Sequence, residues 1–250
     1  MVSNPRLPLF AFAVALVLPA VAAAALDEAA LSLRQKGLAE LENEQPSAAA
    51  ATFAELARRV PDDPLPHANL AIAALRQARL EEARAALARA LALAPARPDL
   101  VAIDAEIAAA SGDLETGLEL FRAAAAGAPG RADLQFALLR NGEALGGEAG
   151  DAAVDAALLR LTRLRPDNLV VLVGAGRRAV ARDDRSAATA AALRIRELLW
   201  EAPDAALEAL DRLTAALEAS DLPRARVPML QLANLLRPGP LFQQGIRELS

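Results

Sequence analysis

Residues 61–95 read PDDPLPHANLAIAALRQARLEEARAALARALALAP, and this stretch decides the fold. The small or apolar residues Ala83, Leu87 and Ala90 follow one another at intervals of four and three, which is the spacing along one face of an α-helix. Proline cannot continue a helical hydrogen-bond ladder, because it has no backbone N–H and its ring clashes with the preceding turn. The stretch therefore predicts a helix that ends just before Pro95.

The same pattern recurs along the chain. Prolines that end such helices follow one another at spacings of 34, 34, 37, 37 and 35 residues, and they are Pro61, Pro95, Pro129, Pro166, Pro203 and Pro238. Eight residues before each of them comes a bulky apolar side chain: Phe53, Leu87, Phe121, Leu158, Ile195 and Leu230. Repeats of this length indicate a solenoid, in which each unit buries its apolar face against its neighbours.

Each unit also predicts an earlier helix. Ten residues after the proline comes Ala71, Ala105, Leu139 or Gly176, and Gly37 is the counterpart in the first unit. A small residue at this place lets the first helix of a unit approach the second closely. Turn-forming residues separate the two helices at 43–47, 111–113, 146–151 and 182–186.

A 34-residue helix–turn–helix unit with these landmarks resembles the tetratricopeptide repeat. The resemblance covers five repeats over residues 27–203, with a degenerate sixth repeat or capping helices and a tail over 204–250. The two aromatic positions of the family's first helix depart from the pattern, since Leu33, His67 and Val101 fill the early one in the first three units. The resemblance implies an all-α, right-handed α-solenoid whose first helices line a concave binding surface.

One stretch favours a different reading. Residues 168–181, NLVVLVGAGRRAVA, carry the G-x-G-x-x-A spacing of a dinucleotide-binding turn. Such a turn needs a parallel sheet around it, and no other strand-like segment follows the N-terminal apolar run. In the repeat, Gly176 falls at the small position of a first helix. We therefore interpret both glycines as part of a soft, closely packed helix.

The composition excludes several kinds of chemistry. The chain has no cysteine and a single histidine, His67, which rules out disulfides, thiolate catalysis and Cys- or His-rich metal sites. The net charge is −5 and Lys36 is the only lysine, so the sequence does not predict a basic surface that would bind nucleic acid. We expect no catalytic residue, no bound metal and no cofactor, and hence a protein that is not an enzyme.

The N-terminus predicts export. Residues 1–25 combine Arg6, an apolar run and small residues, as a cleaved signal peptide does, with cleavage after Ala23, Ala24 or Ala25. The mature chain would then be periplasmic or secreted, with no membrane span. The alternative is an uncleaved anchor over residues 7–26, with the rest of the chain facing the periplasm.

The resemblance also places candidate binding residues. The position after each small landmark would face the concave groove, and Arg34 and Asn69 occupy matching places: the predicted set is Arg34, Leu38, Asn69, Ile72, Glu106, Arg140 and Arg177. We expect a peptide or helix of a protein partner, with its apolar part at Leu38 and Ile72 and its acidic groups near Arg140 and Arg177. The alternative is that these arginines are solvated or paired with nearby carboxylates. The family's clamp for a C-terminal carboxylate is not predicted, because Leu38, Asp99 and Ile103 replace its polar residues.

The sequence thus predicts a non-catalytic protein-interaction scaffold of the bacterial envelope. Two alternatives stay open. One is a structural, self-associating envelope component. The other is the helical N-terminal part of a larger secreted protein, because residues 234–249, NLLRPGPLFQQGIREL, resemble the junction before an FG-GAP/UnbV-type propeller.

Overall fold

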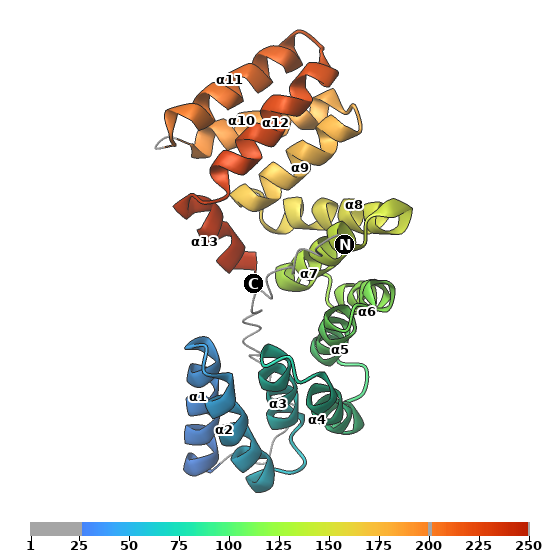
Figure 1. Ribbon diagram of the computed structural model, residues 1–250, viewed down its shortest axis with the longest axis vertical. Helices are drawn as coiled ribbons and strands as arrows, with labels where there is room; N and C mark the ends of the chain where they lie inside the picture. The colour runs from blue at the N-terminus through green and yellow to red at the C-terminus, as the bar shows by residue number, and fades with distance from the viewer. Residues whose placement is uncertain (1–26, 200–201, 250) are drawn as a thin grey trace, which may run out of the picture. The chain divides into compact units, whose positions relative to one another are not determined.

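The computed structural model describes residues 27–199 and 202–249, and all regular secondary structure in this part is α-helical (Figure 1). The helices are α1 (Glu28–Glu42), α2 (Pro46–Arg59), α3 (Pro64–Arg76), α4 (Leu80–Leu93), α5 (Pro98–Ala110), α6 (Leu114–Gly127), α7 (Ala132–Leu145), α8 (Gly147–Leu164), α9 (Leu169–Ala181), α10 (Arg185–Leu198), α11 (Asp204–Glu218), α12 (Leu222–Leu236) and α13 (Pro240–Leu249). The predicted signal peptide lies outside the described residues. Within them, none of the helices has the length and apolar character needed to cross a membrane.

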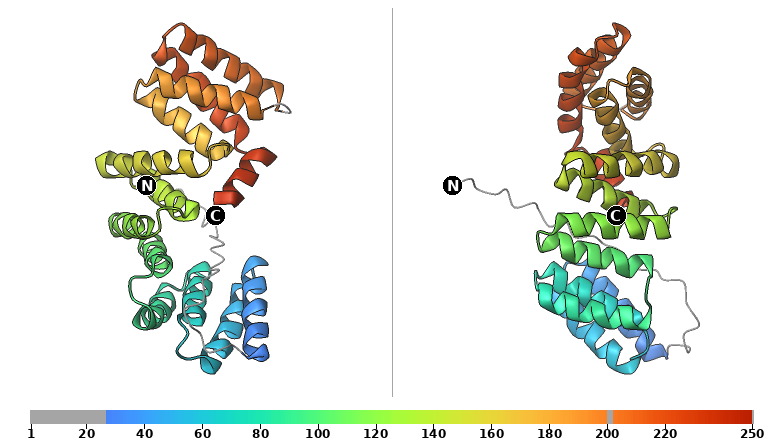
Figure 2. Two further views of the ribbon diagram at one scale, coloured as in Figure 1. Left: turned by 180° about the vertical axis from the view of Figure 1, so that it is seen from behind. Right: turned by 90° about the vertical axis from the view of Figure 1, so that its right-hand side faces the viewer.

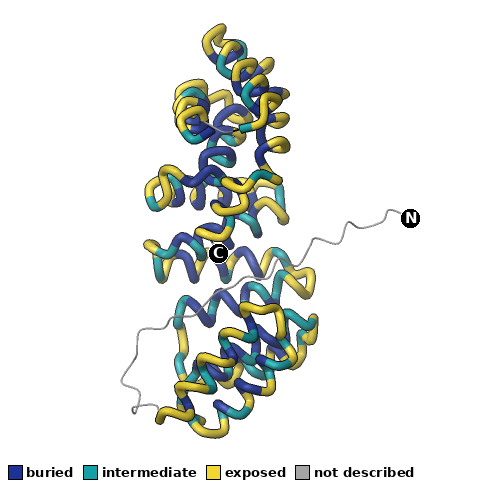
Figure 3. The backbone as a smooth tube through the Cα atoms, turned by 90° about the vertical axis from the view of Figure 1, so that its left-hand side faces the viewer, coloured by how far each residue is buried: buried dark blue, intermediate teal, exposed yellow. Residues whose placement is uncertain are grey.

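Consecutive helices pack as pairs, α1 with α2 through α9 with α10 (Figure 1 and Figure 2). The predicted proline positions fall where these pairs end: Pro61 follows α2, Pro95 follows α4 and Pro129 follows α6. Most helices have a buried face and an exposed face, as an amphipathic helix requires, whereas α3 has no exposed residue (Figure 3). The predicted all-α solenoid is confirmed.

The described residues divide into two compact units, with the boundary between Ala128 and Pro129. Unit 1 contains α1–α6, and its core includes Phe53, Leu87 and Ile107. The small and bulky landmarks of the repeat meet in this core. A Cβ atom added at Gly37 would lie 2.7 Å from Cζ of Phe53, whose side chain is fully buried. Glycine at position 37 is therefore what allows α1 to lie against α2.

Unit 2 begins with a closer helix contact, between α7 and α8. A Cβ added at Gly142 would lie 2.8 Å from the carbonyl oxygen of Gly150, and one added at Gly150 would overlap the carbonyl oxygen of Gly142. The prediction that residues 146–151 form a turn is wrong for most of this segment. Gly146 makes the turn, with φ of 67°, and α8 starts at Gly147. Gly150 is needed for the close packing of α7 and α8. Composition alone does not distinguish a glycine in such a helix contact from a glycine in a turn.

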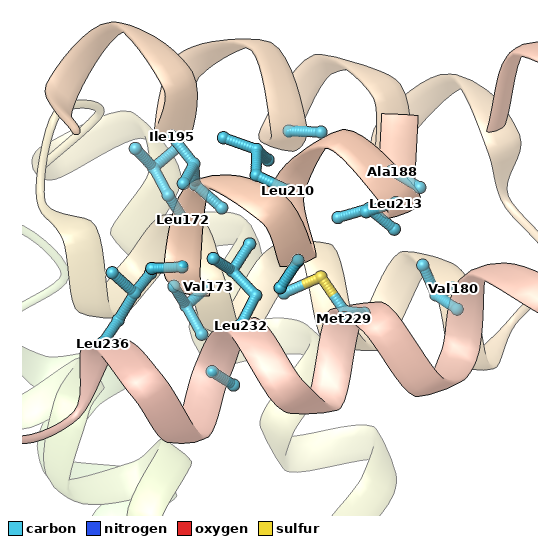
Figure 4. Packing of buried hydrophobic residues seen from close by; sticks show 14 of the residues in the cluster. Leu172, Val173, Val180, Ala188, Ile195, Leu210, Leu213, Met229, Leu232 and Leu236 are labelled. Atoms are coloured by element: carbon cyan, nitrogen blue, oxygen red, sulfur yellow. The ribbon is translucent and has the colours of Figure 1, made fainter. Parts of the chain in front are cut away.

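The other part of unit 2 is a four-helix core formed by α9–α12. Helix α12 packs against α9, while α11 packs against α10, so α9–α12 surround one core (Figure 4). Leu172 and Val173 of α9, Leu210 of α11 and Leu232 of α12 all lie in it. A continuing solenoid would place the first helix of the sixth pair beside α9, and here the second helix takes that place.

The two glycines of the G-x-G-x-x-A stretch lie inside α9, so the segment is helical as the repeat predicts. A Cβ added at Gly176 would lie 3.3 Å from Cβ of Ala191 on α10 and 3.3 Å from Sδ of Met229 on α12. Gly176 is thus the point at which three helices converge.

Helix α13 folds back onto α9 and α7. Asn168, which is 4% exposed, caps α9 by accepting hydrogen bonds from the backbone N–H groups of Val170 and Val171. Its Nδ2 donates to the Gly245 carbonyl at 2.9 Å and to the Glu248 carboxylate at 3.2 Å. One buried side chain therefore both starts α9 and holds α13.

Replacing Asn168 with alanine should lower the free energy of unfolding by roughly 2 kcal/mol, because the change removes an N-cap and the bond to the buried Gly245 carbonyl. Chemical denaturation measures this loss. The matched control is Asp184→Ala, which removes only the cap bond to the Ala187 N–H and should cost about 1 kcal/mol. Equal losses in the two variants would mean that the tie to α13 contributes nothing.

Candidate functional site

A hollow of about 680 Å³ lies within unit 2, between α7, α8, α9 and α12. We call it the unit 2 groove. Its lining combines apolar and charged residues: Leu139, Val154, Leu158, Met229 and Leu230 with Gly142 and Gly174, then Glu143, Asp151, Arg177, Arg178, Arg226 and Arg237. A concave site with apolar surface and a few charged groups is the usual form of a binding site in a folded protein.

The floor of the groove is one face of α9. Gly174, Arg177 and Ala181 line it, and their spacings of three and four residues place them on the same side of the helix. Gly174 lets Leu158 of α8 pack against the backbone of α9, because a Cβ at position 174 would lie only 3.1 Å from Cδ2 of Leu158. Val170 continues this face toward the start of α9, where a Cβ added at Gly245 of α13 would lie 3.1 Å from it. Helix α13 therefore covers one end of the face and leaves the other open.

Helix α12 forms one wall with Arg226, Met229 and Leu230, and Arg237 follows directly after its last residue. Leu230 is 55% exposed and provides apolar surface at the mouth of the groove. This wall is not predictable from the sequence. Residues 204–250 have the pattern of a degenerate repeat or cap, and nothing local in that segment indicates that α12 replaces α11 beside α9.

Arg178, on α9, is held by two carboxylates of α8. Its Nε donates to Asp155 at 2.6 Å and its Nη1 donates to Asp151 at 2.9 Å. The hydrogen bond with Asp155 is the main reason that the pKa of the Arg178 guanidinium is raised above its ordinary value, against the opposing effect of desolvation. Arg178 therefore joins α9 to α8 and has little capacity left for a ligand.

The other arginines of the groove are held weakly. Arg177 lies 3.9 Å from Glu143, and Arg226 lies 3.3 Å from Asp183, with all four side chains exposed by more than two fifths. Exposed pairs of this kind contribute about 0–1 kcal/mol each, so a ligand carboxylate can replace them at little cost. Arg237 is exposed and forms no ion pair with any residue in the described ranges.

The structure distributes the predicted binding residues over both units. Arg34 and Leu38 lie half-buried on α1, and Glu106 lies half-buried on α5. Asn69 and Ile72 on α3 are only 3% and 7% exposed, so they lie in the core of unit 1 and offer little surface.

In unit 2, Arg177 is exposed and lines the groove, while Arg140 of α7 is half-buried and does not line it. The pairing of Arg177 with Glu143 is the arrangement that the sequence analysis held as its alternative for these arginines.

His67 is half-buried on α3, and in the described part of the chain no three His, Asp or Glu side chains come together as metal ligands would. The groove of unit 2 instead combines apolar side chains with four arginines, a lining suited to holding a ligand by contact and charge.

Comparison with solved structures adds to this description. The structure superimposes on PilF of Pseudomonas aeruginosa with a TM-score of 0.61 and 18% identity, over 89% of this chain and 98% of that one. It matches YrrB, described as a TPR protein with an unusual peptide-binding site, with a TM-score of 0.57 and 15% identity, over 79% and 99%. The chain has the tetratricopeptide-repeat fold.

A third tetratricopeptide-like neighbour is PilW, described as a widely conserved type IV pilus biogenesis factor. Its TM-score is 0.56 and its identity is 14%, over 88% of this chain and 100% of that one. No family model and no curated protein matches the sequence. At these identities the neighbours establish the fold of this chain, and function has to be argued from the site.

Proposed function

We propose that the protein is a non-catalytic scaffold that binds a segment of a partner protein in the unit 2 groove. The observation that carries the proposal is the groove itself, with its floor on α9, its walls on α7 and α12, and exposed apolar surface at Leu230. Solenoids of helix pairs use such hollows to hold partner segments. The solved neighbour YrrB, described as having a peptide-binding site, supports the same use of the fold.

We place this scaffold in the bacterial envelope. Residues 1–25 carry the pattern of an export signal. A structural neighbour, PilW, is described as a type IV pilus biogenesis factor, which supports this location. Arg177 provides direct ligand contact in the proposal. The half-buried Arg34, Leu38, Glu106 and Arg140 and the buried Asn69 and Ile72 are secondary candidates.

Site-specific photocrosslinking tests the proposal. A benzophenone amino acid replaces Leu230, which is 55% exposed in the groove, or Leu159, which is 57% exposed on α8 and does not line it. The chain is expressed in cells with its N-terminal residues 1–25 retained. The cells are irradiated, and the adducts are identified by mass spectrometry. We expect a discrete partner adduct at position 230 and none at position 159. Equal labelling at both positions, or no adduct at position 230, would count against the groove as the binding site.

A further inference from the structure

The lining of the unit 2 groove has an excess of positive charge, whereas the whole chain has a negative net charge. The chain has a net charge of −5, yet the groove lining contains four arginines and only two carboxylates. An acidic protein that concentrates arginines in one hollow repels acidic ligands over most of its surface and attracts them there.

We propose that the partner segment is acidic: a short peptide with carboxylates for Arg177, Arg226 and Arg237 and one apolar side chain for the floor. This inference rests on the proposed function, because it names the chemistry of the segment that the unit 2 groove holds.

The three arginines differ from Arg178 in what they can still bind. Arg178 is committed to Asp155 and Asp151. Arg177 and Arg226 keep only long, exposed pairs, at 3.9 Å and 3.3 Å. The guanidinium group offers two parallel N–H donors to a carboxylate, so each of these arginines can exchange its weak pair for a bidentate bond to the ligand.

The apolar side chain of the segment has a defined place. Leu158 packs against the bare backbone of Gly174 on the floor, and Leu230 of α12 lines the same hollow with an exposed side chain. One aliphatic side chain packed against Leu230 would leave water, which stabilises the complex in proportion to the apolar area buried. Charge brings the peptide to the groove, and the apolar contact fixes its register.

The length of the segment follows from the floor. From Gly174 to Ala181 the open face covers two turns of α9, or about 10 Å at the helical rise of 1.5 Å per residue. Beyond it, toward the start of α9, α13 covers the face at Val170. An extended peptide advances about 3.3 Å per residue, so the groove contacts roughly three or four residues.

Selection from a random peptide library tests the inference. Twelve-residue peptides on phage are selected against the full chain, and the affinities of the enriched peptides are then measured by fluorescence anisotropy. The test variant is Arg226→Glu/Arg237→Glu. The matched control is Arg160→Glu/Arg163→Glu, which changes the net charge equally at two exposed arginines of α8 outside the groove lining. Far-UV circular dichroism verifies that both variants are folded.

We expect enriched peptides that cluster Asp or Glu around one aliphatic residue. Their affinity should fall at least 10-fold in the test variant, stay within 2-fold in the control, and weaken as salt is raised. Enrichment of neutral or basic peptides, or acidic peptides that bind the test variant unchanged, would overturn the acidic partner and leave the scaffold proposal standing. Failure to enrich any peptide would instead count against the proposed function, because the groove would then not be a peptide site.

Discussion

Replacing Gly150 with alanine should lower the free energy of unfolding of unit 2 by roughly 2–3 kcal/mol, because the new Cβ would overlap the Gly142 carbonyl oxygen. Both groups belong to helix backbones, so neither can rotate away as a flexible side chain could. Relief requires α7 and α8 to separate, which loosens the wall of the groove. The better helix propensity of alanine, about 1 kcal/mol, offsets only part of the cost. Urea denaturation followed by circular dichroism measures the change.

The control for this substitution is Gly130→Ala. A Cβ at Gly130 meets nothing within 4 Å, and this glycine is not in the left-handed region, so its replacement should change stability by less than about 0.5 kcal/mol. If the two variants were equally stable, the contact between α7 and α8 would not depend on glycine, and our account of Gly150 would be wrong.

Replacing Gly37 with alanine should destabilise unit 1 by roughly 1–3 kcal/mol. Three ring atoms of Phe53 would lie 2.7 to 3.0 Å from the new Cβ, and the ring is 0% exposed, so it has no free space into which to move. The expected result is a lower denaturation midpoint for the transition of unit 1. The unfolding of the two units is followed separately by hydrogen exchange, which resolves α1 and α2 from the helices of unit 2.

A second substitution tests the cause of that loss. In the Gly37→Ala background, Phe53→Leu removes the ring with which alanine clashes. The loss in free energy of unfolding of the double variant should therefore be smaller than the sum of the losses of the two single variants. We expect a favourable coupling of about 1 kcal/mol. Strictly additive losses would show that the two positions do not interact, contrary to the packing of α1 against α2.

The repeat was predictable from the sequence because its signals are local. A proline stops a helix wherever it falls, and the spacing of Ala83, Leu87 and Ala90 defines a buried face without knowledge of the rest of the chain. The same reasoning assigned Gly176 to a helix contact, and the structure places it against Ala191 and Met229. The stretch 146–151 was misjudged because glycines of a turn and glycines of a tight helix contact look alike in a sequence.

The groove was only partly predictable. Arg177 follows from the repeat, since it lies one position past a small landmark. Arg226 and Arg237 do not, because they reach the groove only when α12 takes the place of α11 against α9. That choice depends on how distant apolar faces fit together, which no local pattern encodes. The burial of Asn69 and Ile72 in unit 1 depends on tertiary packing in the same way.

Amide hydrogen exchange of the full chain, with and without an acidic peptide enriched by the library selection, tests the central claim most directly. Bound peptide should slow exchange in α7, α9 and α12, which line the unit 2 groove, and leave α1–α6 unchanged. Slower exchange confined to the helices of unit 1, or unchanged exchange in α9 and α12 at saturating peptide, would contradict it.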